Sequence, residues 1–331
     1  MNSPPLEALV SIPLCTYNGK RFLAAQLDSL LNQTHANLEV LAFDDGSQDG
    51  TVEILLDYAG RDARLRVHVN PLNLGFRANF LQAIRACGGE FIAPCDQDDI
   101  WLPEKLTALI ECIGDRALAY CNSRLVDATA ASLHARVSDY VTMIDGDNPA
   151  PFAFGNCVSG HAMMFHSRLL AKLSTIPSEF FHDWWIAAVA ASSGGIVYCD
   201  RELVWYRQHG ENVTNMMGQR FIVRANRPDG YRLRELREVG RRLEKIATLE
   251  CQRQRFIRRF SVLWIQRETQ WCSWRLCWLM LCHGVQLRRI EKQSRYKIIK
   301  DALQMLPGIK LKRLVSPRAY VADAGSGTHS S

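Results

Sequence analysis

Short apolar runs alternate with amphipathic stretches through the first third of this 331-residue chain. The runs occupy residues 9–12, 38–43, 65–69, 91–93 and 117–121, and each has the length of a buried strand. The stretches between them carry apolar stripes at helical spacing, which we expect to be core: Leu23, Leu27, Leu30, Leu31; Val52, Leu55, Leu56, Ala59; Phe76, Phe80, Ala83, Ile84, Cys87; Leu106, Leu109, Ile110, Ile113. This alternation predicts an α/β fold with a mainly parallel sheet flanked by helices.

Composition is consistent with one or two globular domains, because 47% of the residues are hydrophobic and can bury a large core. The first seven residues have no basic start and no apolar stretch behind them, so we expect no secretory signal and a cytoplasmic protein. Eleven cysteines without a Cys-x-x-Cys pair indicate reduced, mostly buried thiols and not a disulfide framework or a zinc site.

Polar motifs follow four of the apolar runs, at residues 15–19, 44–47, 70–75 and 96–99. In an open parallel sheet, ligands bind beyond the carboxyl ends of the strands, so we expect these loops to converge on one edge. A Gly-x-Gly-x-x-Gly motif after the first run and a Gly-x-x-x-x-Gly-Lys motif are both absent, which argues against a dinucleotide site and a P-loop.

Three carboxylates lie within four residues at Asp96, Asp98 and Asp99. Carboxylates this close repel one another unless a cation compensates them, and oxygen ligands with open positions suit Mg²⁺ or Mn²⁺ holding a diphosphate. The alternative is an acidic loop in which Asp98 or Asp99 caps the next helix, with Pro103 in its first turn.

The order and spacing of these motifs resemble those of the inverting family 2 glycosyltransferases of GT-A fold, and most closely the rhamnosyltransferase-like branch. The resemblance extends from about residue 9 to about residue 214 and rests on four segments: Ile12-Pro13 with residues 15–19, residues 44–51, Asn73-Leu74-Gly75 and residues 95–101. It implies a nucleoside-diphosphate sugar donor, a divalent cation and a catalytic carboxylate.

The resemblance implies a nucleotide site in the first three loops. It places Thr16, Tyr17 and Asn18 near the base or ribose, and Asp45, with Asp44 as a second candidate, against a pyrimidine ring. Asp44 and Asp49 could instead cap the following helix. Asn73 and Arg77 would contact ribose or phosphate, although Arg77 could equally be a solvated charge.

For the cation, the resemblance implies Asp98 as a direct ligand and Asp96 as the residue that orients sugar, ribose or metal. Asp99 would bind either of them or cap the helix. The closing segment 204–214 would add His209 as a metal ligand and Arg207 as a phosphate contact, since imidazole suits Mn²⁺ and a guanidinium offsets the charge of the leaving group. Residues 156–164 resemble the acceptor-side strand, and His161 within them has no assigned role.

The segment 179–186 matches the family segment that carries the general base, which implies that Asp183 takes the proton of the acceptor hydroxyl. Trp184 and Trp185 beside it would stack against sugar faces. The alternative is that Asp183 is a helix N-cap and both tryptophans are core.

The charge of the chain is uneven: residues 219–320 hold 25 Lys and Arg against 8 Asp and Glu. We therefore expect a catalytic domain over residues 1–215, a basic helical extension over 216–320 and a disordered tail over 321–331. Residues 271–285 are apolar but too short for the ~20 residues of a membrane span. Two alternatives remain, a helix in the membrane interface with Trp at the boundary, and a helical hairpin with a solvated basic face. Nucleic-acid binding would also suit the charge, but no recognised motif accompanies it.

Together these features predict a metal-dependent inverting glycosyltransferase. It would move a sugar, with rhamnose from dTDP-rhamnose as the first candidate, to a cell-surface polysaccharide or lipid-linked oligosaccharide, at the inner face of the plasma membrane. The alternatives are another donor such as a UDP-hexose, a binding module without turnover, and a nucleotidyltransferase, whose glycine-rich basic loop is missing after the first run.

Overall fold

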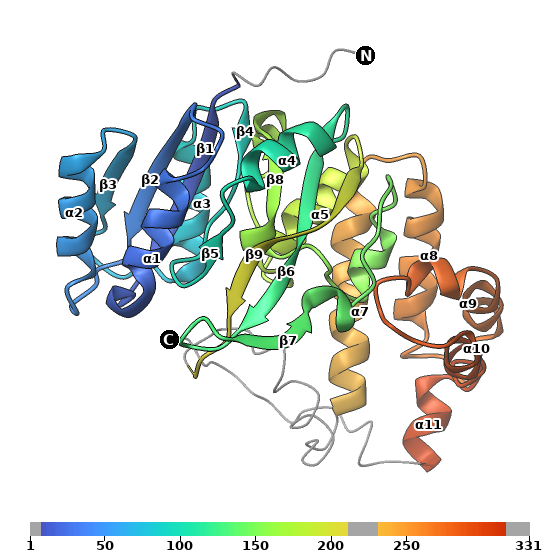
Figure 1. The fold of residues 1–331 in the computed structure, drawn as a ribbon. Helices are drawn as coiled ribbons and strands as arrows, with labels where there is room; N and C mark the ends of the chain where they lie inside the picture. The colour runs from blue at the N-terminus through green and yellow to red at the C-terminus, as the bar shows by residue number, and fades with distance from the viewer. Residues whose placement is uncertain (1–7, 211–230, 316–331) are drawn as a thin grey trace. The chain divides into compact units, whose positions relative to one another are not determined.

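The structure is a computed structural model that describes residues 8–210 and 231–315 (Figure 1). The chain divides into two compact units, residues 1–149 with 156–214 and residues 150–155 with 215–331. The first is called unit 1 and the second unit 2. The predicted disordered tail, 321–331, and the ends of the predicted extension, 216–230 and 316–320, lie outside the described residues.

Unit 1 begins with the predicted alternation of strands and helices. Its elements to residue 113 are β1 Val10–Thr16, α1 Lys20–Leu31, β2 Leu38–Asp44, α2 Thr51–Arg61, β3 Leu65–Val69, α3 Phe76–Ala86, β4 Phe91–Ile92, β5 Ile100–Trp101 and α4 Lys105–Ile113. Strands β3, β2, β1 and β4 are neighbours in this order and all parallel, with Val40 opposite Ile12 on one side and Leu65 on the other. Their carboxyl ends therefore point to one edge of the sheet.

The second half of the sheet is mixed. Its elements are β6 Leu118–Val126, β7 Ser132–Arg136, β8 Met163–His166 and β9 Ile196–Arg207, with short 3-10 helices η1 Val137–Asp139, η3 Gly160–Ala162 and η4 Ser167–Lys172 and helix α5 His182–Ser192. β8 pairs antiparallel with β4 and β6, whereas β6 and β9 are parallel. The predicted acceptor-side strand over 156–164 is wrong for most of its length, because β8 begins only at Met163.

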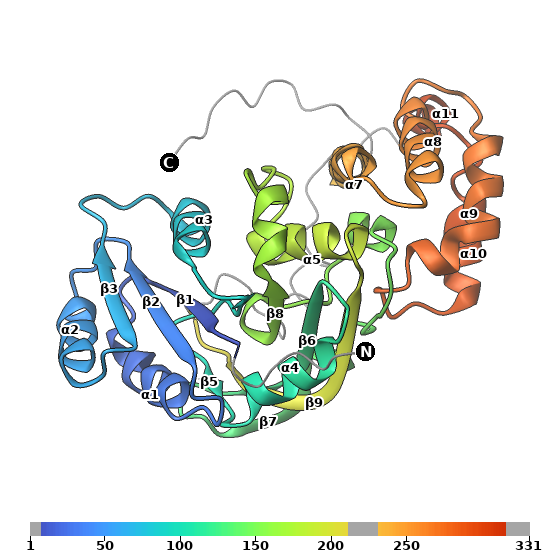
Figure 2. The same ribbon diagram turned by 90° about the horizontal axis from the view of Figure 1, so that it is seen from above.

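Helices cover both faces of the sheet (Figure 2): α1, α2 and α4 lie on one side and α3 and α5 on the other. The stripes of α1 and α4 are buried in one apolar cluster with β1, β2 and β4, which confirms most of the predicted core. Leu56 and Phe76 depart from the prediction because their side chains are 56% and 38% exposed. Both side chains lie at the margin of their apolar stripe and are not fully covered by the sheet.

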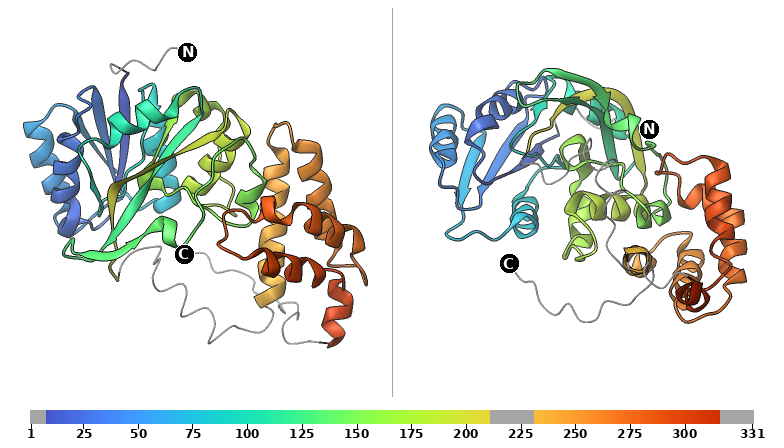
Figure 3. Two further views of the ribbon diagram at one scale, coloured as in Figure 1. Left: turned by 45° about the vertical axis from the view of Figure 1, so that its right-hand side comes forward. Right: turned by 90° about the horizontal axis from the view of Figure 1, so that it is seen from below.

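Unit 2 is helical, as the basic extension was predicted to be (Figure 3). Its elements are η2 Ala150–Ala153, α7 Tyr231–Thr248, α8 Gln254–Gln266, α9 Trp274–Leu287, α10 Arg295–Leu303 and α11 Ile309–Val315. Its core includes Phe260 and Trp264, and the ring of Phe154 lies 6.1 Å from the first and 5.5 Å from the second. None of the helices that the structure describes is long and apolar enough to cross a membrane.

Candidate functional site

The four loops that follow β1 to β4 are joined by hydrogen bonds, as the parallel strand order requires. The side chain of Gln97 accepts from the Tyr17 N–H at 2.9 Å and donates to the Tyr17 carbonyl at 3.1 Å. Asn18 donates its N–H to Ser47 Oγ at 2.8 Å and accepts from the Gln48 N–H at 3.0 Å. Asn18 has a φ of +47°, a left-handed conformation that Asn tolerates. Tyr17 is 49% exposed, so its ring is open to a ligand.

Asp44 is buried and organises the turn after β2. Its carboxylate accepts from Thr16 Oγ1 at 2.8 Å, from Ser47 Oγ at 2.6 Å and from the N–H groups of Gly46 and Ser47 at 3.1 and 2.8 Å. These bonds fill its acceptor sites, so the structure favours a supporting role for Asp44 and Thr16 over contact with a base. Asp44 does not cap α2; Asp49 accepts from the Thr51 N–H at 3.0 Å at the start of that helix.

Asp45 ties the loop after β2 to the loop after β3. It accepts from the N–H groups of Leu74 and Gly75, both at 2.8 Å, and from Asn70 Nδ2 at 2.9 Å. Asn73, predicted to contact ribose or phosphate, accepts from the Gly75 N–H at 3.0 Å. Gly75 has a φ of +82°, which glycine adopts without strain. Asp45 therefore shapes the wall of the predicted nucleotide site.

Arg77 on α3 is directed toward the segment that precedes α5. Its Nη1 donates to the Ser178 carbonyl at 2.8 Å, and its guanidinium lies 5.5 Å from the centre of the Phe181 ring. Arg77 is nevertheless exposed, so the alternative of a solvated charge stays open. The predicted ribose or phosphate contact would have to compete with this bond.

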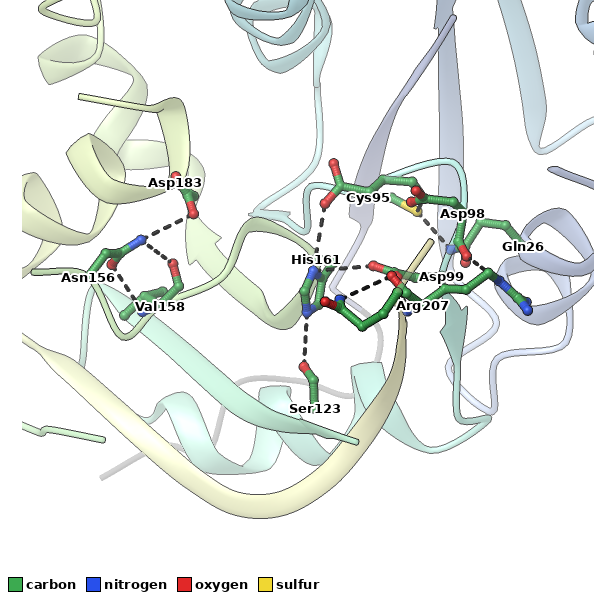
Figure 4. A network of polar contacts seen from close by, with 12 residues as sticks. Gln26, Cys95, Asp98, Asp99, Ser123, Asn156, Val158, His161, Asp183 and Arg207 are labelled. Atoms are coloured by element: carbon green, nitrogen blue, oxygen red, sulfur yellow. Dashed lines mark hydrogen bonds and ion pairs between the residues drawn. The ribbon is translucent and has the colours of Figure 1, made fainter. Parts of the chain in front are cut away.

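The carboxylate cluster lies beyond β4, as predicted, and a histidine from η3 lies against it (Figure 4). His161 Nδ1 is 3.2 Å from Asp99 Oδ2 and 3.6 Å from Asp96 Oδ2, while its Nε2 is 3.0 Å from Ser123 Oγ. Ligand atoms of Asp96, Asp99 and His161 all lie within 4.8 Å of one another. Sequence reasoning left His161 without a role, because nothing in its spacing connects it with the carboxylates.

This cluster fits a divalent cation. Asp99 is fully buried, and among the described residues its Oδ2 is approached only by His161 Nδ1, at 3.2 Å and without regular hydrogen-bond geometry. Two carboxylate oxygens and an imidazole nitrogen form a donor set that Mn²⁺ and Mg²⁺ accept. Asp99 does not cap α4, because its Oδ1 accepts from the Arg207 N–H at 3.0 Å.

Asp98 pairs with His209, the histidine that was predicted as a metal ligand. His209 Nε2 lies 2.8 Å from Asp98 Oδ2, and the His209 ring packs 4.8 Å from that of Phe22. Arg207 is buried, and it donates from Nε to the Asp98 carbonyl at 2.8 Å and from Nη1 to the Ala128 carbonyl at 3.0 Å. Arg207 thus fixes the backbone of the carboxylate loop, a role that the sequence did not predict.

Burial and mutual repulsion perturb the carboxylates. Burial raises the pKa of Asp99 well above its ordinary value, and Asp98 and Asp96 add to the rise. Burial and Asp96 also raise the pKa of Asp98. Behind the cluster, Lys105 is fully buried and donates to the His161 carbonyl at 2.6 Å, and burial lowers the pKa of its ammonium to about 7. The protein itself therefore compensates the negative charge of Asp98 and Asp99 poorly, whereas His161 lowers the pKa of Asp96.

Asp183 is in the first turn of α5, whose N-cap is Phe181, so the N-cap alternative is wrong. Its Oδ2 accepts from Asn156 Nδ2 at 3.1 Å, and its Oδ1 accepts from the Trp184 N–H at 2.7 Å. Burial, with a smaller contribution from Asp96, raises the pKa of Asp183 to about 7. A carboxyl group with this pKa can exchange a proton near neutral pH.

The two tryptophans after Asp183 differ in accessibility. Trp185 is 6% exposed and its ring lies 5.1 Å from that of Phe180, so the core alternative holds for it and the predicted stacking on a sugar face is wrong. Trp184 is partly exposed, with its ring edge-on to Phe180 at 5.7 Å. It keeps a surface that a sugar could meet.

Comparison with known proteins shows which family part of the chain resembles. Residues 11–167 match the family described as Glycosyl transferase family 2. A glycosyltransferase of Haemophilus influenzae is 34% identical over 106 residues, which are 31% of this chain and 33% of that protein. The Escherichia coli UDP-Glc:alpha-D-GlcNAc-diphosphoundecaprenol beta-1,3-glucosyltransferase WfgD is 38% identical over 100 residues, 30% of this chain and 39% of its own. The chain thus spans between a third and two fifths of the length of these two relatives.

Solved structures confirm the predicted GT-A fold. The S. aureus TarS fragment 1–349 in complex with UDP-GlcNAc has a TM-score of 0.53 at 16% identity, over 93% of this chain and 83% of the fragment. The mannosyltransferase PcManGT from Pyrobaculum calidifontis, in complex with GDP-Man and Mn²⁺, has a TM-score of 0.51 at 16% identity, over 94% and 81% of the two chains. At this identity the similarity establishes the fold alone.

Proposed function

We propose that this chain, which matches Glycosyl transferase family 2 over residues 11–167, is a metal-dependent inverting glycosyltransferase acting on a nucleoside-diphosphate sugar. The observation that carries the proposal is the presence of two different carboxyl environments in unit 1. The Asp96, Asp98 and Asp99 group is suited to a cation, and Asp183 has a pKa raised to about 7. A binding module without turnover would have no need of Asp183 in this state.

Asp183 is the proposed general base. Its carboxylate takes the proton of the acceptor hydroxyl as that oxygen forms a bond to the anomeric carbon. The bond between this carbon and the diphosphate oxygen breaks on the opposite face, and its electron pair leaves with the nucleoside diphosphate, so the configuration inverts. Asn156 holds the carboxylate in place through the bond to Oδ2. Trp184 borders the acceptor side and excludes water.

The proposed cation ligands are Asp96, Asp98, Asp99 and His209, to which we add His161. Mg²⁺ or Mn²⁺ bound there would offset the charge that develops on the leaving diphosphate. Arg207 would hold the carboxylate loop in place for the cation through its hydrogen bond to the Asp98 carbonyl. Two observations support the assignment, the poorly compensated charge of Asp98 and Asp99 and the presence of Mn²⁺ in the PcManGT complex.

The nucleotide is proposed to bind against the first three loops. Tyr17 and Asn18 would meet the base and ribose directly, whereas Thr16, Asp44 and Asp45 would hold the loops in shape. Asn73 and Arg77 would border the ribose and phosphates. The exposure of the Tyr17 ring and the internal bonds of Asp44 and Asp45 support this division of roles.

For the donor we propose dTDP-rhamnose, on the motif resemblance, with a UDP-hexose as the alternative. The alternative draws support from the name of the Escherichia coli relative, which specifies UDP-Glc. That name also specifies a diphosphoundecaprenol-linked sugar, which supports a lipid-linked saccharide as the acceptor. Such an acceptor would place the enzyme at the inner face of the plasma membrane in a cell-surface polysaccharide pathway.

The test is release of nucleoside diphosphate from a panel of UDP-, GDP- and dTDP-sugars with Mg²⁺ or Mn²⁺. Wild type is compared with Asp98→Ala and Asp183→Asn, and the exposed Asp115→Asn is the matched control. Metal-dependent turnover of one donor that both site variants lose and the control retains would establish the reaction. If a donor binds to wild type but is never turned over, even with lipid-linked acceptors added, the chain is a binding module.

A further inference from the structure

Helix α9 carries an apolar stripe that faces solvent. Trp274 and Trp278 are 61% and 66% exposed, and Leu281 and Val285 continue the stripe at intervals of three and four residues. Leu276, Cys277, Met280 and Leu287 lie on another face of the same helix and are buried. The helix therefore packs one apolar face into the core of unit 2 and leaves a second apolar face open.

Helix α10 carries a second exposed stripe, formed by Tyr296, Ile299 and Leu303. The start of α9 is joined to the end of α10, because the Ser273 N–H donates to the Leu306 carbonyl and the Gly308 N–H to the Trp271 carbonyl, both at 2.8 Å. The two helices are therefore antiparallel neighbours (Figure 3). Together the two exposed stripes are called the α9–α10 face. Contiguous exposed apolar surface of this kind marks a contact site.

Positive charge surrounds the α9–α10 face. Between residues 271 and 306 the chain has seven Lys and Arg against two acidic residues, Glu291 and Asp301. Both acidic residues are bound to Arg288 in salt bridges, at 2.5 and 2.6 Å. Within residues 271–306, the exposed cations for which the structure describes no acidic partner are Arg275, Arg289, Lys292, Arg295, Lys297 and Lys300.

We infer that the α9–α10 face binds the surface of an anionic phospholipid bilayer. Tryptophan and tyrosine prefer the boundary between headgroups and acyl chains, aliphatic side chains enter the acyl region, and Lys and Arg meet the phosphates. α9 has 14 residues, about 21 Å, so it lies along the interface and does not span the membrane. A second copy of this chain is disfavoured as the occupant, because the same cations would meet each other across a self-contact.

This inference does not depend on the proposed glycosyl transfer, because its residues belong to unit 2 and take no part in the site. If both hold, the bilayer supplies a lipid-linked acceptor at high local concentration. Failure of donor turnover would leave vesicle binding intact, and failure of vesicle binding would leave donor hydrolysis intact. The two results are therefore separable.

The experiment is co-sedimentation of the full chain with vesicles of phosphatidylcholine, alone or mixed with phosphatidylglycerol. Binding to the mixed vesicles is expected to fall at least about tenfold in Trp274→Ser/Trp278→Ser, because two large exposed rings are lost. Arg275→Glu/Arg289→Glu is expected to lower it by more than about twentyfold, since each cation near the surface contributes about fivefold. Added salt should weaken the electrostatic contribution to vesicle binding.

Two matched controls distinguish binding by the α9–α10 face from non-specific hydrophobic binding and from an effect of net charge. Leu56→Ser/Leu72→Ser removes two apolar residues of similar exposure from unit 1, and Arg253→Glu/Arg255→Glu makes the same charge change at the start of α8. Both should bind like wild type. Trp274→Phe/Trp278→Phe should also bind, but quenching of tryptophan fluorescence by brominated lipid should fall, which reports contact and not folding.

The inference would be overturned if all variants bound the mixed vesicles equally. It would also be overturned if the α8 control lost as much vesicle binding as Arg275→Glu/Arg289→Glu. A dimer in sedimentation velocity that the tryptophan variants dissociate would overturn it too, if wild type ignores anionic vesicles, because the face would then be a contact between copies. A circular dichroism spectrum unchanged from wild type is required of each variant.

Discussion

Asp183 shows how the surroundings of one side chain determine its chemistry. Its carboxyl group lies in the first turn of α5 among Trp184, Asn156 and Val158, and burial raises its pKa to about 7. At that pKa, a carboxylate is basic enough to accept a hydroxyl proton as the oxygen becomes a nucleophile, and it is still ionised in half of the molecules at neutral pH.

The rate should therefore depend on pH through Asp183. Because only the ionised form accepts a proton, kcat/KM should be constant above about pH 7 and fall about tenfold per unit below it. Asp183→Asn should lower kcat by ~10²–10⁴-fold while leaving donor affinity within about twofold. Initial rates across the pH range at saturating metal measure both effects. A profile that stays flat through pH 7 would contradict the assignment.

Ionisation of the Asp183 carboxyl group should lower the free energy of unfolding. The folded protein holds the Asp183 proton up to about pH 7 and the unfolded chain loses it near 3.8, so the free energy of unfolding falls as the pH rises between these values. Asp183→Asn should remove this cost and stabilise the protein by about 2–4 kcal/mol at pH 8 and by little at pH 4. Urea unfolding at the two pH values measures the gain, with Asp115→Asn as control. An equal gain at both would contradict the electrostatic explanation.

His161 should contribute to cation affinity although sequence spacing did not reveal it. His161→Gln should weaken Mn²⁺ binding by about 10–100-fold, whether the ring ligates the ion or holds Asp99 for it. Isothermal titration with Mn²⁺ measures the change, and the exposed His134→Gln is the control. An unchanged affinity would limit the cluster to Asp96, Asp98, Asp99 and His209.

At the scale of elements, hydrogen bonds join the loops beyond β1 to β4 to one another. Asp45 makes two of these hydrogen bonds, because its carboxylate accepts from two N–H groups of the loop after β3. Donor binding should therefore be sensitive to a residue that need not touch the donor.

Asp45→Ala should lower the free energy of unfolding by about 1–3 kcal/mol, because the Leu74 N–H loses its acceptor and the Gly75 N–H keeps only Asn73 Oδ1. It should also weaken donor binding. Urea unfolding and amide exchange at Leu74 and Gly75 test this, with Asp57→Ala as control because its salt bridge with Arg61 is at the surface. Equal effects in both variants would contradict the proposed role of Asp45.

Sequence periodicity predicted elements whose partners are near in the chain and missed those whose partners are distant. The stripe of α1 and the run of β2 follow from local spacing, and both were predicted correctly. β5 has only two residues and pairs with β9, far along the chain, so no local pattern reveals it. The site divides in the same way: Asp96, Asp98 and Asp99 are adjacent in sequence, whereas His161 meets them only after folding.

At the scale of the whole molecule, the eleven cysteines are free, and seven of them are buried. This agrees with the expectation that most of the thiols are buried. Cys272 and Cys282, before and within α9, are exposed.

Native protein should therefore react rapidly at two thiols and slowly at the others, whereas denatured protein should react at all eleven. Labelling with a chromogenic disulfide gives the counts, and Cys272→Ser/Cys282→Ser should abolish the fast phase. A fast phase that persists in this variant would show that the partly buried Cys112 or Cys251 opens readily.

The chain enters unit 2 twice. Residues 150–155 belong to unit 2, yet they lie within the stretch that otherwise forms unit 1, and they contribute Phe152 and Phe154 to its apolar interior. A gene cut near residue 215 would therefore separate a helical module from part of its own core. No single cut in the chain would divide the protein into its two units, so we expect a fragment that begins near residue 215 to lack two aromatic residues of its own core.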